Sequence, residues 1–274
     1  GSNRFVKTNG SGTTCSQALP CKLTTALTQS VRGDNIYVAA GTYTGTGGAV
    51  ITLTASVVLY GGWDGASSGG IVRNPNTYVS VLDGQNQRRV VYMNTSLTPT
   101  VDGFTITRGN AVGKPYGSWS GGVGAGIFGQ STNPIISNNI ITHNTILTSG
   151  TPAGAGIYLS NASAASRIEG NTIISNTSGS GCAGYGGGIL LDSSSTIVQT
   201  NTLTLNCASV GSPLNVNSMC PLIRNNLIQG NTSGGAVHVL FSSALIQSNQ
   251  IISNPLGGLV IYNTPVTIDR NVIA

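Results

Sequence analysis

The chain has 274 residues, of which 39% are hydrophobic and only 7% are charged, and it contains 39 glycines. Because an average soluble domain is roughly 25% charged, Ser, Thr, Asn and Gln must solvate most of this surface, which argues against a cytosolic helical enzyme. The net charge of +5 is the difference between 12 Lys and Arg and seven Asp and Glu, and the cations form no run. No nucleic-acid partner is therefore expected, although a mildly cationic surface favours acidic polysaccharides. No apolar stretch approaches the length of a membrane span, so none is predicted.

The first 45 residues are expected to form a cap and a first coil. Residues 1–2 look like the remnant of a removed tag, so the domain is expected to begin at Asn3. A short strand is predicted over 4–8 and a further strand over 34–43. The apolar spacing between them predicts a helix over Leu23–Val31, which Gly33 ends.

Five cysteines suggest disulfides and no zinc site, because none of their spacings matches a zinc motif. Cys15 and Cys21 flank a short loop with a proline, and we expect them to pair in an oxidising compartment. Cys182–Cys207 is the preferred second pair, with pairings that use Cys220 left open. The remaining thiol is expected to be buried.

Short strands and loops alternate over the next part of the chain. Strands are expected over 50–60, in two segments within 78–93, and again from residue 101. The loop 61–76 and the insertion 110–123 interrupt this pattern. Loops on one flank of a repeat protein are where binding usually occurs.

One six-residue phrase recurs from about residue 103 to the end of the chain. It opens with Asn, has an apolar residue at its third position, and in most copies repeats Asn five residues later. The copies begin at Asn139, Asn171, Asn201, Asn226, Asn249 and Asn271. Their spacing falls from 32 to 22 residues, which is typical of a solenoid. We expect Asn at the corners because it tolerates a left-handed backbone.

A second apolar phrase, rich in small residues, lies between these copies. Its examples open at Gly124, Gly154, Gly186, Gly234 and Gly257. Two or three short strands for each coil of about 22 residues predict an all-β fold, a right-handed parallel β-helix. The N-terminal helix would then cover the open end of the solenoid.

The cap and first coil thus occupy residues 3–45, and residues 46–274 form the coils of one continuous domain. The last coil would present an open edge at Ala274. We therefore expect the natural protein to continue past this residue, or another subunit to cover the coil, so that an oligomer can form there.

Several segments resemble a known family. Phe5–Lys7 with Gly41–Tyr43, then Leu59–Asp64, Val81–Gly84 and Asp102–Ile106, are similar to the opening coils of secreted bacterial right-handed β-helix proteins of the pectate-lyase-like superfamily. That group includes polymorphic outer-membrane-type proteins. The resemblance implies a secreted or cell-surface protein. It implies no single activity, because the superfamily contains lyases, hydrolases, epimerases and adhesins.

Two glycine-rich matches are better explained by the repeat. Gly124–Gly129 fits G-x-G-x-x-G, but its sister phrases repeat without the helix and the distant acid that a dinucleotide site requires. Gly121–Gly129 is close to a calcium-binding nonapeptide, but Gly126 stands where the ligand Asp belongs. No cofactor is therefore expected, and Ca²⁺ remains a weak alternative through Asp64, Asp83 and Asp102.

Two functions fit these features. The first is a non-catalytic secreted or cell-surface module for adhesion or glycan binding, which the scarcity of charge favours. The alternative is a carbohydrate-active enzyme, most plausibly a polysaccharide lyase acting on acidic glycans. Such a lyase needs a cation to neutralise the uronate carboxylate and a base to remove the C5 proton. The pectate lyase, polygalacturonase and epimerase phrases of the superfamily are absent from this sequence.

The candidate site residues follow from these two functions. If the protein is an enzyme, we expect catalysis by Asp83, Arg88 and Lys114, in a groove beside the insertion 110–123. The wider set of candidate bases is Arg73, Arg88, Arg89, Lys114, Tyr116 and His143. A hydrolase would instead need two converging carboxylates, for which Asp83 and Asp102 on adjacent coils are the candidates.

Glycan binding is expected on the residues that break the repeat. Trp63, Tyr116 and Trp119 can offer an aromatic face to a sugar, and Arg73 adds a cation. His143 and His238 occupy repeat positions where other copies have unrelated residues, which argues against catalysis by either.

Overall fold

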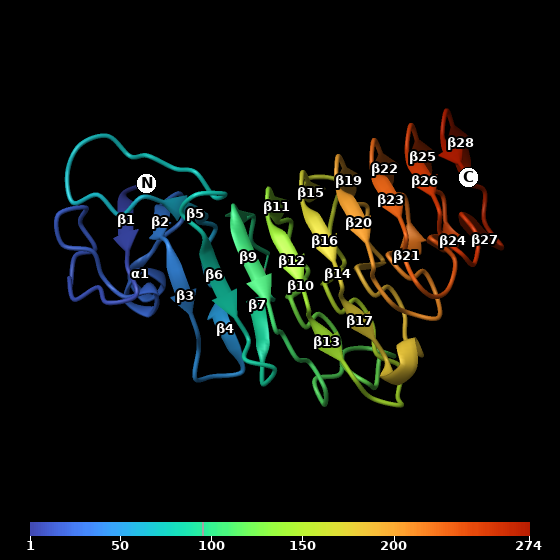
Figure 1. Cartoon of the computed structure of the whole chain (residues 1–274), viewed down its shortest axis with the longest axis horizontal. Helices are drawn as coiled ribbons and strands as arrows, with labels where there is room; N and C mark the ends of the chain where they lie inside the picture. Colours follow the sequence, from blue (N-terminus) through green and yellow to red (C-terminus); the bar gives the residue numbers. More distant parts are fainter. Residues whose placement is uncertain (95) are drawn as a thin grey trace.

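The computed structural model describes residues 1–94 and 96–274. Within them the chain winds through short parallel strands that stack into three long sheets, with the termini at opposite ends of the stack (Figure 1). The predicted parallel β-helix is confirmed, and each complete coil contributes one strand to each of the three sheets.

Sheet A contains β1 (Asn3–Val6), β2 (Asn35–Ala39), β5 (Val58–Trp63), β8 (Thr100–Asp102), β11 (Ile135–Ser137), β15 (Arg167–Glu169), β19 (Ile197–Gln199), β22 (Leu222–Arg224), β25 (Leu245–Gln247) and β28 (Thr267–Asp269). Sheet B contains β3 (Gly41–Tyr43), β6 (Ser80–Asp83), β9 (Phe104–Thr107), β12 (Ile140–Thr142), β16 (Thr172–Ile174), β20 (Thr202–Thr204), β23 (Leu227–Gln229), β26 (Gln250–Ile252) and β29 (Val272–Ile273).

Sheet C contains β4 (Ala49–Thr52), β7 (Arg89–Met93), β10 (Ile127–Gln130), β14 (Ile157–Ser160), β18 (Ile189–Asp192), β21 (Leu214–Met219), β24 (Val237–Ser242) and β27 (Leu259–Tyr262). The remaining elements are the paired strands β13 (Thr145–Ile146) and β17 (Thr177–Ser178), the helix α1 (Leu23–Gln29) and the 3-10 turn η1 (Ser180–Cys182). No helix in the described part of the chain has the length and apolarity that crossing a membrane requires.

The core is the inside of the solenoid, where the third residue of each repeated phrase is buried. These residues pair in register through sheet B and belong to one apolar cluster: Ile141, Ile173, Leu203, Ile228 and Ile251. Because the side chains of a strand alternate between its two faces, the flanking residues of each phrase point outward. The apolar third position of each repeated phrase in the sequence therefore marks the residue that points into the solenoid.

Asparagine side chains bond each coil to the next through two buried ladders. In the second ladder, the Oδ1 of Asn176 accepts from the backbone N–H of Asn144 at 3.1 Å and from its Nδ2 at 3.0 Å. The Nδ2 of Asn176 donates to the Ile141 carbonyl at 2.9 Å and to the Oδ1 of Asn206 at 3.0 Å. Every polar atom of this fully buried amide thus has a partner.

The expected role of asparagine at the corners is wrong in one respect. The residue with a left-handed backbone is not the ladder asparagine but the residue before it, such as His143 (φ 53°) or Leu205 (φ 54°). The ladder asparagine stays in the ordinary region and contributes its side-chain hydrogen bonds. Residues as different as His, Leu, Ser, Thr and Arg occur at the left-handed position because its side chain points into solvent.

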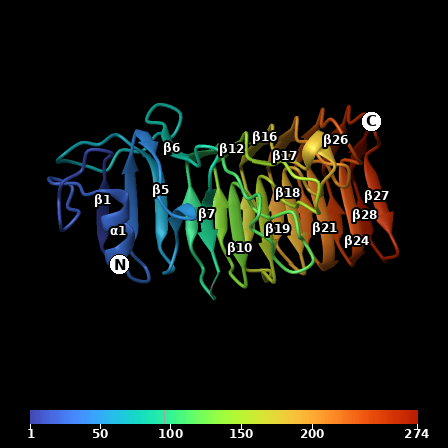
Figure 2. The same ribbon diagram turned by 90° about the horizontal axis from the view of Figure 1, so that it is seen from below.

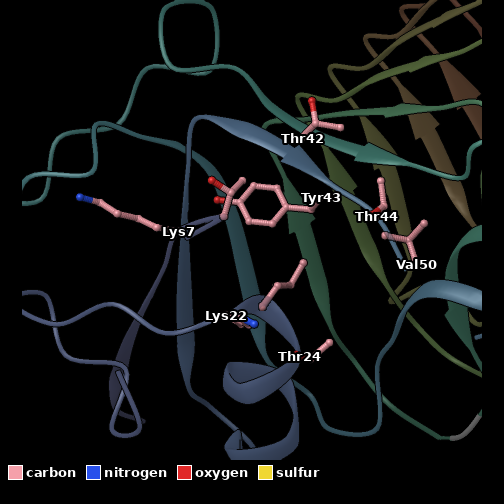
Figure 3. Close-up of a pocket in the computed structure, with 9 residues that line it drawn as sticks. Lys7, Lys22, Thr24, Thr42, Tyr43, Thr44 and Val50 are labelled. Atoms are coloured by element: carbon pink, nitrogen blue, oxygen red, sulfur yellow. The ribbon is translucent and has the colours of Figure 1, made fainter. Parts of the chain in front are cut away.

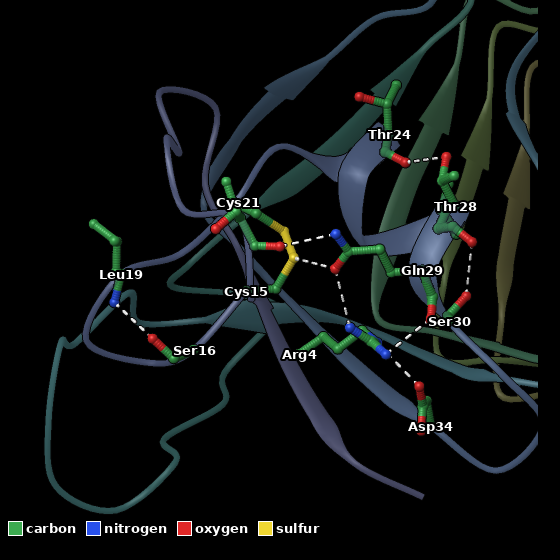
Figure 4. Close-up of a disulfide and its surroundings, with 12 residues drawn as sticks. Arg4, Cys15, Ser16, Leu19, Cys21, Thr24, Thr28, Gln29, Ser30 and Asp34 are labelled. Carbon is green, nitrogen blue, oxygen red and sulfur yellow. Dashed lines mark hydrogen bonds and ion pairs between the residues drawn. A yellow bond between two sulfur atoms is a disulfide. The ribbon is translucent and has the colours of Figure 1, made fainter.

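The cap is assembled from polar contacts around α1 (Figure 4). Arg4 donates from Nε to Asp34 at 2.9 Å and from Nη2 to the Gln29 carbonyl at 2.8 Å. Leu23 and Ala26 of α1 join the solenoid core, so the helix lies over the N-terminal end, as predicted (Figure 2). Helix α1 ends two residues before its predicted end, because the backbone is extended at Ser30.

Both predicted disulfides are present. Cys15 pairs with Cys21 in the cap, and Cys182 pairs with Cys207 between the inserted loops of successive coils. Cys220 is free and exposed, so the expected burial of the remaining thiol is wrong. It follows β21 directly, at a corner where the chain leaves sheet C on the outer surface.

We predict that Asn176→Ala lowers the free energy of unfolding by about 3 kcal/mol, because it leaves several buried donors and acceptors without partners. The matched control is Asn271→Ala in the half-exposed last coil, where water can replace the lost bonds. Urea unfolding followed by circular dichroism gives both values. Equal losses for the two variants would contradict the role assigned to burial.

Candidate functional site

The inserted loops between sheets B and C fold over the outer face of sheet C (Figure 2). This outer face carries a column of stacked rings at the same position of successive strands. Tyr92 lies 5.1 Å from Phe128, and Phe128 lies 5.7 Å from Tyr158, measured between ring centroids. The insertion 110–123 places Tyr116 edge-on to both Phe128 and Tyr158, at 5.7 and 6.0 Å.

The same insertion is anchored by Asp192 of β18. The Nε1 of Trp119 donates to Asp192 at 2.9 Å, and the hydroxyl of Tyr158 donates to the same oxygen at 2.8 Å. Trp119 also packs edge-on against Tyr185, with 5.1 Å between centroids. Tyr116 and Trp119 are therefore partly buried in a second apolar cluster outside the solenoid, and they fix the loop over the sheet.

Arg89 lies under the edge of this insertion. Its Nε donates to the Val123 carbonyl at 2.9 Å and its Nη2 to the Lys114 carbonyl at 2.8 Å. The guanidinium stacks over Phe128, 4.6 Å from the ring centroid. Burial lowers the pKa of Arg89 to about 10, so the group remains charged at neutral pH. No carboxylate of the described residues forms an ion pair with it.

A hollow of about 410 Å³ opens beside this guanidinium. Arg89 and Lys114 supply two cations, and Tyr92 supplies an aromatic wall. The remaining lining residues are Gly48, Ala49 and Thr52. We call this hollow the sheet C pocket. It combines excess positive charge with an aromatic ring, which suits an anionic ligand that also has an apolar face.

The comparisons with known proteins agree with this architecture. Residues 64–212, more than half of the chain, match the family model described as a right handed beta helix region. The chain belongs to the right-handed β-helix family. The predicted right-handed β-helix is thereby confirmed, and a search of curated proteins found no match.

Among solved structures, this β-helix is similar to the one titled crystal structure of pectate lyase Pel9A. The match has a TM-score of 0.50 and 14% sequence identity, and it covers 99% of this chain and 79% of that chain. At this level of sequence identity, the structural match shows that the two chains share a fold and does not show that they share an activity.

The structure places the three predicted catalytic residues, Asp83, Arg88 and Lys114, in different surroundings. Lys114 lies at the sheet C pocket, but Asp83 and Arg88 do not line it. Asp83 ends β6 in sheet B, where Arg108 of the next coil donates to both carboxylate oxygens. Arg88 lies at the turn before β7, donates from Nη2 to Gln87 at 2.8 Å, and leaves Nε and Nη1 buried without an acceptor in the described residues. The predicted groove of Asp83, Arg88 and Lys114 is therefore wrong.

The expected pair of carboxylates also fails. Asp102 ends β8 in sheet A, in register with Tyr60 and Ser137, whereas Asp83 is in register with Thr107 of sheet B. The two aspartates therefore lie on different faces. Within residues 1–94 and 96–274, no three His, Cys, Asp or Glu side chains gather in a group that could hold a metal ion.

The predicted binding residues have mixed outcomes. Trp63 is completely buried against Phe5, so it offers no face to a sugar. Arg73 stacks on Tyr60, 4.2 Å from the ring centroid, and forms an ion pair of 2.6 Å with Asp102. These contacts make Arg73 a link between coils on sheet A. Its backbone pairs with that of Trp63, and it lies on a different face from Tyr116 and Trp119.

Neither histidine reaches the sheet C pocket. His143 is an exposed corner residue that contacts Thr142. His238 extends the column of outward residues on sheet C, and burial lowers its pKa.

Arg89 and Tyr92 were missed as the main site residues. The sequence did contain a signal for this site. Phe128 and Tyr158 occupy the same position in two of the glycine-rich phrases, and this repetition indicates a column of aromatic side chains on one face. Tyr92 continues that column in a strand outside the recognisable repeat. Arg89 was considered only as one of several interchangeable cations.

Another pocket lies beside α1, lined by threonines, Lys7 and Lys22. Figure 3 shows the amino group of Lys7 pointing away from the other labelled side chains. That nitrogen lies 5.8 Å from the ring centroid of Trp63. The two lysines therefore do not converge on one ligand position, and the pocket is a weaker candidate than the sheet C pocket.

The Asp83–Arg108 pair predicts a pH dependence. Burial raises the pKa of Asp83, but the hydrogen bonds from Arg108 and from the N–H of Gln85 outweigh it, so the pKa lies below its ordinary 3.8. The stabilisation is therefore fully present above about pH 4 and is lost as the pH falls through the lowered folded-state pKa.

We predict that Asp83→Asn lowers the free energy of unfolding by about 2 kcal/mol at pH 7, and that the difference from the parent chain shrinks below pH 4. Chemical unfolding across this pH range measures it. Asp269→Asn, which alters an exposed pair with Arg270, serves as the control with a smaller effect. A difference that persists unchanged at low pH would contradict the assignment.

Proposed function

We propose that this β-helix protein is a secreted or cell-surface module that binds acidic polysaccharide at the sheet C pocket without cleaving it. The observation that supports this function most is the partly buried Arg89 guanidinium, which has no carboxylate partner among the described residues and opens onto a hollow shared with Lys114. The carboxylate of a uronate sugar would neutralise the charge of the Arg89 guanidinium. The two disulfides suit an oxidising compartment.

The geometry of the pocket favours an extended glycan over a compact anion. The Tyr92 ring can contact the apolar face of a sugar while Arg89 and Lys114 contact its carboxylate. Arg89 is held by two backbone carbonyls and by Phe128 before any ligand arrives. Such preorganisation reduces the entropy lost on binding.

We predict that Lys114→Ala weakens binding of polygalacturonate about fivefold, because one partly exposed charge contact contributes about 1 kcal/mol. Isothermal titration calorimetry at low and at high salt measures this, and added salt should weaken binding by the parent chain. Lys22→Ala, which removes an exposed lysine of the cap, is the matched control.

Equal weakening by the two lysine variants would show nonspecific attraction to a cationic protein. Absence of any binding to polygalacturonate or to alginate would refute the proposal for these polymers.

A second function, β-elimination of a uronate polymer, is favoured by the proximity of the same two cations. Arg89 would neutralise the carboxylate, and Lys114 would remove the C5 proton. The bond from C4 to the glycosidic oxygen would then break, the leaving oxygen would take up a proton, and a C4–C5 double bond would form. Against this, Asp83 and Arg88 do not line the pocket.

The ultraviolet absorbance of the unsaturated product separates the two functions. Incubation with polygalacturonate or alginate, with and without calcium, is expected to produce no increase for a binding module. An increase that Lys114→Ala abolishes and Lys22→Ala preserves would instead establish the lyase.

A further inference from the structure

A polar groove runs along the outer corner between sheets A and B, away from the sheet C pocket. It consists of two adjoining hollows of about 440 and 470 Å³, which share Asp102, Asn138 and Gly170. Hydroxyl and amide groups line most of it: Asn76, Thr100, Ser137, Thr172 and Thr200. The groove crosses successive coils, whose strands β11, β15 and β19 lie side by side in Figure 1.

The acceptors on one side of the groove are fixed by their neighbours. Asp102 accepts from Arg73 at 2.6 Å on Oδ1, and from Ser137 at 2.8 Å and Asn138 at 2.7 Å on Oδ2. Arg73 is itself held against Tyr60 and by the Gly61 carbonyl at 3.0 Å. The carboxylate therefore keeps its position without a ligand.

The other side is held in a similar way. Glu169, the only glutamate of the chain, accepts from Nε2 of Gln199 at 2.7 Å, and Oε1 of Gln199 accepts from Arg224 at 2.8 Å. Ser137 lies in register between Asp102 and Glu169. At a strand spacing of about 4.8 Å, the two acidic residues are roughly 10 Å apart at their Cα atoms.

We propose that this groove binds a neutral oligosaccharide, which lies along the solenoid axis. Carboxylates, amides and hydroxyls at regular spacing can pair with the hydroxyls of successive sugar units, and Tyr60 and the half-exposed Ile140 supply apolar contact. The lining contains one cation, Arg73, and two carboxylates, Asp102 and Glu169, so the groove has a net negative charge.

This charge distinguishes the groove from other kinds of site. A polyuronate or a nucleic acid would be repelled by the net negative lining. An added peptide strand needs a free sheet edge, whereas β8, β11 and β15 each pair on both sides. The groove and the sheet C pocket thus select glycans of different charge.

The test uses cellohexaose, xylohexaose and mannohexaose as probes in isothermal titration calorimetry with the whole chain. At least one is expected to bind, and Glu169→Gln is expected to weaken it about tenfold, because a hydrogen bond to a charged acceptor is replaced by a weaker neutral one. Asn138→Gly is a second variant that keeps the left-handed backbone (φ 55°) and removes an amide of the lining, with a several-fold loss expected.

The controls separate this groove from the sheet C pocket. Asp269→Asn removes a carboxylate in the same column of sheet A but outside the groove, and it should leave affinity unchanged. Lys114→Ala should also leave it unchanged, so failure of the polyuronate proposal would not affect this result. Absence of binding by all three hexasaccharides, or binding that neither Glu169→Gln nor Asn138→Gly weakens, would overturn the proposal.

Discussion

The hydrogen bonds of buried asparagine side chains are the constraint on which the rest of the structure depends. Inside the stack, a ladder amide such as that of Asn176 bonds to the coil before it and to the coil after it, and all of its polar atoms are satisfied away from water. A shift of register by one residue would break these bonds and also turn the apolar residues outward. The ladders therefore hold successive coils in a single register.

A single register places equivalent positions of successive coils in straight columns on the outer faces. One such column is the ring stack that ends at Tyr92, and another is the polar series through Asp102, Ser137 and Glu169. Neither column is needed to form the core. The outer positions are thus free to vary in chemistry, and each candidate site occupies one of these columns.

Loops then decide which parts of a column remain accessible. The insertion 110–123 covers Phe128 and Tyr158 with its own aromatic residues and leaves an opening beside Arg89 and Lys114. On sheet A, Arg73 reaches from the loop 61–76 to Asp102 and closes one end of the polar groove. The same kind of insertion therefore buries some outward residues and creates a pocket from others.

The sequence by itself determined the coil, the buried apolar position, the capping helix and the Cys15–Cys21 disulfide, because each depends on local spacing or on a period that repeats along the chain. It left the partner of Cys182 open between Cys207 and Cys220, and the contact between successive loops selects Cys207. It did not determine the sites. Asp83 and Arg88 were expected beside Lys114, but Asp83 lies in sheet B and Arg88 lies at the turn before β7, outside the sheet C pocket. Trp63 was expected in a loop but lies in a buried aromatic cluster. Which outward side chains meet depends on how loops from different coils fold over the sheets, and only the tertiary structure decided that.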